Sequence, residues 1–346
     1  MSGNGGVVPN NIKNRLASAM FSRLPSRLLK SLVEVNPIIA YYHIVSDDDV
    51  PHVKHLYPIR SVDQFRKDIE TFLSLYKPIT LDSLVESIRG GRPLAANSFL
   101  LTFDDGFREI YDVIAPILLS KGVPATFFLC SAFLDNLGMA HHNKISLLLD
   151  YLVRLKTEIP RKVIGDILRH HGIESSDIRS SLLSIDYRKK DAVDKIAAIV
   201  GCDFNSYLSA AIPYVTSGQV RKLINNGFSI GAHSIDHPLY AALSIDEQLD
   251  QTRTSVRLIR DRFLVPYSAF AFPHGDSGVS ERFFQKIFEL GAVDVSFGTR
   301  GILKDAFPRH FQRFSMEYDS APTKKILGRH YARSFFKGLI KGAGTR

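Results

Sequence analysis

Cysteine and long apolar runs are scarce in this sequence. Only Cys130 and Cys202 occur in 346 residues, which is too few for a disulfide framework and leaves no cysteine cluster for a metal. No run approaches the ~18 apolar residues that a membrane span needs. No apolar stretch of a secretory signal follows the glycine-rich first residues. We therefore expect a cytoplasmic protein in which both thiols are reduced.

Acidic residues are missing from two segments near the ends of the chain. Residues 11–33 and 323–346 carry lysine and arginine but no aspartate or glutamate. The overall net charge is +9, but the chain outside these two segments is mildly acidic. No basic patch lies near the candidate site described below, which argues against nucleic-acid binding. Apolar residues interleave these charges, so each end would suit a solvated tail, docking on its own domain, or peripheral contact with an anionic inner membrane.

Strand-like and helix-like segments alternate through the body of the chain. Apolar runs without polar alternation, such as 99–103 and 125–130, are typical of buried strands in a parallel sheet. Capped amphipathic segments, such as 62–76 and 245–262, are typical of the helices that cover such a sheet. About seven strands of this kind predict an α/β fold whose sheet closes into a barrel.

One long segment differs from this pattern. From about 135 to 215 the sequence shows helical periodicity and no strand signal, so we interpret it as a helical insertion. The predicted organisation is a basic N-terminal extension at 1–36, a barrel at 37–320 interrupted by the insertion, and a basic amphipathic C-terminal tail at 321–346. Within the barrel we also expect a helix at 107–121, directly after the strand at 99–103.

Polar residues follow several of the predicted strands. Because the chemistry of a parallel barrel gathers at the carboxyl ends of its strands, we expect these residues to meet at one face. They are His43, Asp104 with Asp105, His233 with His237, and His274 with Asp276.

The adjacent carboxylates Asp104 and Asp105 are costly at the end of a buried strand unless a cation or a proton transfer uses them. His233 and His237 are four residues apart, a spacing that in a helical turn puts both rings on one side. Two imidazoles and one carboxylate suit a zinc-like cation with an open position for water. The second carboxylate is then free to act as a base, and His43 is a candidate proton donor. Each motif alone is common on ordinary surfaces, but the combination favours a metal site.

These motifs resemble those of a known family. The sequences Thr-Phe-Asp-Asp-Gly at 102–106 and His-Ser-Ile-Asp-His-Pro at 233–238 are similar to the first two motifs of the polysaccharide deacetylases, carbohydrate esterase family 4. Phe-Ala-Phe-Pro-His-Gly at 270–275 resembles the third motif. The resemblance covers residues 37–317 apart from the insertion. It implies a deformed (β/α)7 barrel that binds a divalent metal, commonly Zn²⁺, and removes an acetyl group from a sugar.

The resemblance also implies roles for individual residues. Asp105, His233 and His237 would bind the metal, and Asp104 would be the general base. The sequence Tyr-Tyr-His-Ile at 41–44 resembles the branch that deacetylates poly-N-acetylglucosamine, in which the catalytic-acid histidine lies near the N-terminus. His43 would inherit that role.

The third motif departs from the family pattern, because His274 replaces the usual tyrosine. The backbone N–H of His274 can still face an oxyanion beside Pro273, and its ring adds a titratable group. Arg313 resembles the arginine that orients the base in some members. We also expect His55, in the long loop at 46–60, to help shape substrate choice.

The predicted reaction is hydrolysis of an N-acyl group, above all N-acetyl, on a sugar in surface polysaccharide or glycolipid biosynthesis. A cytoplasmic enzyme would meet a sugar nucleotide or a lipid-linked glycan. The alternatives are a de-N-formylase, an O-deacetylase and a non-catalytic carbohydrate-binding homologue. A phosphatase would show more carboxylates at strand ends, and a glycosidase would need two well-separated carboxylates around its substrate.

Overall fold

The structure, a computed structural model, describes residues 34–155, 158, 160–174, 177–317 and 320–343. The predicted basic segment at 11–33 therefore lies outside the described residues. At the centre of the fold is a parallel sheet in the order β8-β7-β6-β5-β4-β3-β1-β9, with β2 beside β3. The strands are β1 (Ile38–Tyr42), β2 (Lys77–Pro78), β3 (Ser98–Phe103), β4 (Thr126–Leu129), β5 (Ser229–Ala232), β6 (Ala269–Ala271), β7 (Val295–Gly298), β8 (His310–Gln312) and β9 (Phe314–Ser315).

One short segment closes this sheet into a barrel. β8 pairs with β7 and β9 pairs with β1. Residues 310–315 therefore connect the two edges of the sheet, and Arg313 is the one residue between the two strands. The backbone N–H of Arg313 donates to the carbonyl of Gly298 at 3.1 Å, and that of Met316 donates to the carbonyl of Tyr41 at 3.1 Å. If β8 and β9 are counted as one strand and β2, which pairs only with β3, is left aside, the barrel has seven strands. The predicted deformed (β/α)7 barrel is thus confirmed.

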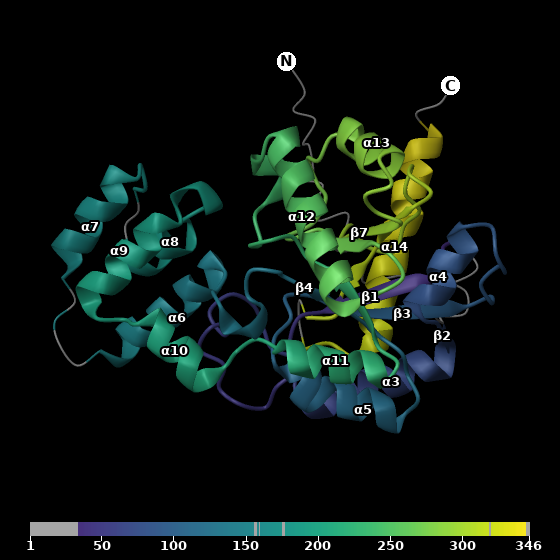
Figure 1. Cartoon of the computed structure of the whole chain (residues 1–346), viewed down its shortest axis with the longest axis horizontal. Helices are drawn as coiled ribbons and strands as arrows, with labels where there is room; N and C mark the ends of the chain where they lie inside the picture. Colours follow the sequence, from purple (N-terminus) through teal and green to yellow (C-terminus); the bar gives the residue numbers. More distant parts are fainter. Residues whose placement is uncertain (1–33, 156–157, 159, 175–176, 318–319, 344–346) are drawn as a thin grey trace, which may run out of the picture.

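Helices cover the outside of the barrel (Figure 1). Their first turns are capped as the sequence indicates: Ser61, Thr216 and Ser244 each form a capping box, which satisfies backbone N–H groups that have no partner within the helix. The covering helices are α3 (Val62–Leu75), α4 (Leu81–Ile88), α5 (Ala115–Ser120), α11 (Ser217–Asn225), α12 (Ile245–Phe263), α13 (Glu281–Glu289) and α14 (Thr323–Ala343).

A group of five helices lies to one side of the barrel, where the insertion was expected (Figure 1). It has a hydrophobic core of its own, which also includes Phe107 and, from the stretch after β1, Ile44, Val50 and Val53. That loop is tied to the group because Asn143 donates to the carbonyl of His52 at 2.9 Å and Ser146 to that of Pro51 at 2.7 Å. The helices are α6 (His141–Arg154), α7 (Arg161–His170), α8 (Ile178–Leu183), α9 (Asp191–Val200) and α10 (Phe204–Ala211).

The helix expected at 107–121 begins later than predicted. The helical segment starts with a π-helical turn at Ile110–Ile114 and continues as the α-helix α5. Asp105 and Gly106 have positive φ angles of 71° and 76°, and Phe107 forms a bridge with Tyr214 of the segment that returns from the insertion. The chain after β3 therefore makes a sharp turn before it can enter a helix.

The first part of α14 docks on the barrel. Ile326, Leu327 and Tyr331 are buried in the main core, and the hydroxyls of Tyr331 and Tyr76 lie 2.7 Å apart. Lys324 and Lys325 on the same helix are exposed. In the part of the chain that the structure describes, no helix has the length and apolar character needed to span a bilayer.

Candidate active site

The register of the sheet brings His43 and Asp104 together. β1 pairs with β3 so that Tyr42 is opposite Phe103, and the N–H of Asp104 donates to the carbonyl of Tyr42 at 2.9 Å. Both residues therefore leave the sheet at the same end. β5 ends at Ala232, opposite Phe270 of β6, which brings the segments after these strands to that end as well.

Asp104 is held by Arg313. The two guanidinium nitrogens Nη1 and Nη2 donate to Oδ1 and Oδ2 of Asp104, both at 2.7 Å, and Nη1 also donates to the hydroxyl of Thr102 at 3.0 Å. Arg313 is fully buried and Asp104 is 2% exposed. Burial alone would raise the pKa of Asp104, but the charge of Arg313 lowers the pKa below its usual value. Asp104 is thus an oriented, ionised carboxylate.

Asp105 turns away from this pair and faces two histidines. Its Oδ1 lies 3.1 Å from Nε2 of His237 and 3.5 Å from Nε2 of His233. The left-handed conformation of Asp105 gives its carboxylate a direction different from that of Asp104. Burial lowers the pKa of His233 to about 4, so this ring is neutral near pH 7, the form that binds metals.

The three side chains fit a metal ion. They are among the described groups whose ligand atoms all lie within 4.8 Å of one another, and Oδ1 of Asp105 is buried without a hydrogen-bond partner among the described residues. The Nδ1 of His233 lies 2.8 Å from the carbonyl of Ala271, which fixes Nε2 as the ligand nitrogen. Two imidazole nitrogens and a carboxylate oxygen are the donor set that suits a zinc-like ion with open positions.

The two histidines do not converge through a helical turn, as the four-residue spacing suggested. Residues 233–239 are a loop in which Ser234 and His237 have positive φ angles of 67° and 63°. The Ser234 hydroxyl accepts the N–H of His237 at 3.0 Å. A tight loop therefore gives the rings the proximity that a helix would have given them.

His43 is held by a carboxylate that the sequence analysis missed. Its Nδ1 lies 2.5 Å from Oε2 of Glu317, while Oε1 of Glu317 accepts the N–H groups of His43 and Ile44 at 2.8 and 3.0 Å. Burial alone would lower the pKa of His43, but Glu317 outweighs it and raises the pKa to about 9. The ring is therefore an imidazolium near pH 7. Glu317 follows β9 by two residues, so a search for carboxylates after the last strand would have found it.

The sequence matches the family model of the polysaccharide deacetylases over residues 91–170 and 185–293, which is more than half of the chain. The chain belongs to the polysaccharide deacetylase family. The predicted family is thus confirmed, while the branch with an N-terminal catalytic histidine stays a prediction.

Relatives of this deacetylase-family chain extend the comparison. A 60-residue segment is 35% identical to the poly-β-1,6-N-acetyl-D-glucosamine N-deacetylase of Escherichia coli K12, and covers 17% of this chain but only 9% of that relative. The Streptococcus pyogenes deacetylase PplD, solved in complex with acetate, has a TM-score of 0.55 at 14% identity over 85% of this chain and 97% of its own. IcaB from Ammonifex degensii has a TM-score of 0.53 at 13% identity over 84% and 96%. Both structures are similar in fold.

The third deacetylase motif places His274 beside the metal-binding group. The ring centroids of His274 and His237 are 4.5 Å apart. His274 is exposed and has a positive φ angle of 57°, and its backbone N–H has no hydrogen-bond partner among the described residues. Pro273 is buried and has no N–H, so an oxyanion contact from this turn would come from His274. A side chain at Gly275 would collide with Thr299 at 2.3 Å, which accounts for the glycine.

The structure also places the remaining expected residues. The contacts of His55 lie with the helical group, because its Nδ1 is 3.0 Å from Nη1 of Arg179 and its Nε2 is 3.9 Å from Asp150; its contact with substrate stays a prediction. Arg313 is buried against Asp104, which is the contact that a base-orienting arginine needs, while that role stays a prediction. Asp276 is buried in a separate group, where it contacts the buried His310 and the exposed Arg300.

Tyr57, from the loop at 46–60, also belongs to the site. Its ring lies against that of His43, with 4.9 Å between the centroids, and its hydroxyl is buried without a hydrogen-bond partner among the described residues. Burial raises the pKa of Tyr57, and the nearby Asp105 adds to the effect. A neutral hydroxyl donor is thus available next to the imidazolium.

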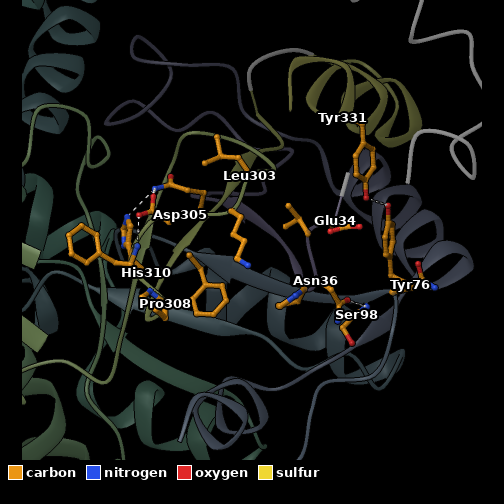
Figure 2. A pocket seen from close by; sticks show the side chains of 16 residues that line it. Glu34, Asn36, Tyr76, Ser98, Leu303, Asp305, Pro308, His310 and Tyr331 are labelled. Atoms are coloured by element: carbon orange, nitrogen blue, oxygen red, sulfur yellow. Dashed lines mark hydrogen bonds between the residues drawn. The ribbon is translucent and has the colours of Figure 1, made fainter. Parts of the chain in front are cut away.

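A cavity of about 460 Å³ lies at the other end of the barrel (Figure 2). Its walls come from residues where strands begin, such as Asn36 before β1, Ser98 at the start of β3 and His310 at the start of β8. In Figure 2 the paired hydroxyls of Tyr76 and Tyr331 stand at one side of this cavity. It is therefore separate from the residues that follow the strands.

Proposed function

We propose that this chain is a metal-dependent carbohydrate deacetylase that removes an N-acetyl group from an amino sugar. The observation that carries the proposal is the division between the adjacent carboxylates. Asp105 faces His233 and His237, whereas Asp104 is bound by Arg313. One carboxylate is thus available to a metal and the other to a proton.

Asp105, His233 and His237 would hold a divalent cation, for which zinc suits the nitrogen and oxygen donors. Such an ion, when bound, is a Lewis acid that polarises the acyl carbonyl and makes water more acidic. This chemistry needs a base that does not itself bind the ion. Asp104 meets the requirement because both of its oxygens accept from Arg313, which keeps the carboxylate ionised and oriented.

The residues of the chain supply the proton transfers. Asp104 accepts a proton from the attacking water. The backbone N–H of His274 lies in the turn where an oxyanion could be stabilised. His43 donates a proton to the departing nitrogen through Nε2, since Nδ1 is bound to Glu317. An amine is a poor leaving group unless it is protonated, so a partly buried imidazolium at His43 favours amide over ester hydrolysis.

A relative supports one class of substrate. The Escherichia coli relative is named as a poly-N-acetylglucosamine deacetylase, which supports an N-acetylglucosamine-containing glycan. We further propose that the reaction serves surface polysaccharide or glycolipid synthesis in the cytoplasm, on a sugar nucleotide or a lipid-linked glycan. Contact with the inner membrane would fall to basic segments, of which 11–33 lies outside the described residues.

The function is tested by acetate release. Purified protein loaded with Zn²⁺ is incubated separately with N-acetylglucosamine oligomers and with N-acetylated sugar nucleotides. The assay measures free acetate and the mass of the sugar product, which is expected to be lower by about 42 daltons when an acetyl group is replaced by hydrogen. Release by the wild type and by the surface variant Asp63→Asn, but not by Asp104→Asn, supports the proposal. Zinc binding without release from any of these substrates would contradict it.

A further inference from the structure

Three histidines form a second group beside the metal-binding residues. His142 stands in the first turn of α6, His237 in the loop after β5, and His274 in the turn after β6. One ligand atom of each ring lies within 4.8 Å of the other two. The ring centroids are 4.5 Å apart between His142 and His237, 4.5 Å between His237 and His274, and 5.4 Å between His142 and His274. The helical insertion and the barrel thus each contribute to one imidazole cluster.

Two nitrogens of this cluster are buried without a hydrogen-bond partner among the described residues. They are Nδ1 of His237 and Nδ1 of His142, and His237 is only 4% exposed. The neighbouring His233 differs, since its Nδ1 lies 2.8 Å from a backbone carbonyl. A histidine that binds metal through one nitrogen normally has a partner for the other, and a buried polar atom without one is costly. Something outside the protein is therefore expected at Nδ1 of His237.

The chemistry of the cluster selects a cation of a particular class. Imidazole nitrogens bind zinc, nickel and copper, whereas calcium and magnesium prefer oxygen ligands. The cluster has three imidazoles and no carboxylate of its own. By contrast, the carboxylates of the group Asp276, Asp305 and His310 already have partners within the protein. Arg300 forms ion pairs with both aspartates, and Gln312 donates to both.

We propose that His142, His237 and His274 bind a second divalent transition-metal ion, such as Zn²⁺, next to the ion of the Asp105 group. His237 would contribute one ring nitrogen to each ion. Nε2 faces Asp105, and we assign Nδ1, which has no hydrogen-bond partner among the described residues, to the second ion. The second ion replaces the proton on Nδ1, which passes to solvent. Because His142 belongs to α6, this ion also fastens the helical insertion to the barrel beside the open face of the first site.

The site is tested by metal stoichiometry on the full chain. Protein stripped with a chelator is dialysed against Zn²⁺, and the bound metal per chain is measured by mass spectrometry. The wild type is expected to hold two ions and His142→Ala one. His141→Ala is a matched control, since His141 is the neighbouring residue but is not in the cluster, and it should hold two. Because His274 is exposed, His274→Ala tests the same site with little risk to folding and should hold one.

The outcomes separate this inference from the proposed function. One ion in the wild type, or equal binding by wild type and both cluster variants, would overturn the second site. Acetate release is measured on the same samples. Two bound ions without acetate release would overturn the deacetylase proposal and support the second metal site. One bound ion with acetate release would overturn the second metal site and support the deacetylase proposal.

Discussion

The Nδ1 atom of His43 lies 2.5 Å from Oε2 of Glu317, which is 274 residues further along the chain. The same carboxylate accepts the backbone N–H groups of His43 and Ile44, so Glu317 holds both the ring and the end of β1. Nε2 is then the nitrogen left for a substrate. This arrangement resembles the carboxylate–imidazole pairs that orient histidine in other hydrolases.

Replacing this carboxylate should change the pH dependence of turnover. The pKa of His43 is raised to about 9. If the protonated ring is the acid, as we propose, activity should fall as the pH rises through about 9. In Glu317→Gln the pKa should drop toward about 6.5, and the alkaline limb of the kcat profile should move down with it. We expect kcat near pH 8 to fall by about 10- to 100-fold.

The measurement is a pH–rate profile of acetate release. Glu70→Gln serves as the control, since this residue is an exposed carboxylate whose partner is Lys121 on the surface. An alkaline limb that stays in place in Glu317→Gln would show that His43 is not the acid, even if the rate falls.

Substitution can separate the proposed general base, Asp104, from the proposed metal ligands. Asp104→Asn keeps the hydrogen-bonding shape but cannot accept the proton, so turnover should fall by at least about 100-fold. Asp105, His233 and His237 are untouched, and zinc binding should persist. His237→Ala is the opposite case and should lose zinc. Zinc content by mass spectrometry and acetate release are measured on both variants; appreciable turnover by Asp104→Asn would contradict its assignment as base.

The buried pair of Arg313 and Asp104 should also matter for stability. Arg313→Met leaves the Asp104 charge unpaired in the core, which is expected to cost about 3–5 kcal/mol of unfolding free energy. Because the folded pKa of Asp104 is depressed, the stabilisation by the pair is present above the unfolded pKa of about 3.9. It is lost as the pH falls through the lowered pKa.

Urea unfolding at pH 7 measures this cost. The double variant Asp104→Asn with Arg313→Met should recover part of the lost stability, because it removes the unpaired charge. A double variant that loses the sum of the two single effects would mean that the ion pair is not the source of the stability.

Much of the barrel and the metal-binding group could be predicted from the sequence, because both depend on local patterns. Buried strands leave continuous apolar runs. Asp105 follows one such run, and His233 and His237 follow another. The family resemblance named Arg313 but not Glu317, and the contacts that these residues make with Asp104 and His43 are set by how the barrel closes. Arg313 occupies the break between β8 and β9, and Glu317 follows it. Neither contact is encoded by spacing, since both depend on residues 310–315 meeting β1 and β7 at once.

The position of His142 next to His237 likewise could not be predicted from local sequence patterns. The insertion was expected as a run of helices, but its direction relative to the barrel depends on tertiary contacts. Asn143 and Ser146 bind the loop at 51–52, and this packing puts the start of α6 over His237. The loop that separates His233 from His237 illustrates the same limit, because its positive φ angles replace the helical turn that the spacing suggested.

Replacing Tyr57 should lower activity without lowering stability. Its hydroxyl is buried without a partner among the described residues, next to the His43 ring, so we expect it to donate to the substrate. Tyr57→Phe should lower kcat/KM by about 3- to 10-fold, the range of one hydrogen bond. The unfolding free energy should stay equal or rise, because a buried hydroxyl without a partner is removed. Tyr111→Phe, on the outer layer of the barrel, is the control for a tyrosine outside the site. A Tyr57→Phe variant that loses stability and keeps full activity would show that the hydroxyl is structural, since only a role in the native packing produces that combination.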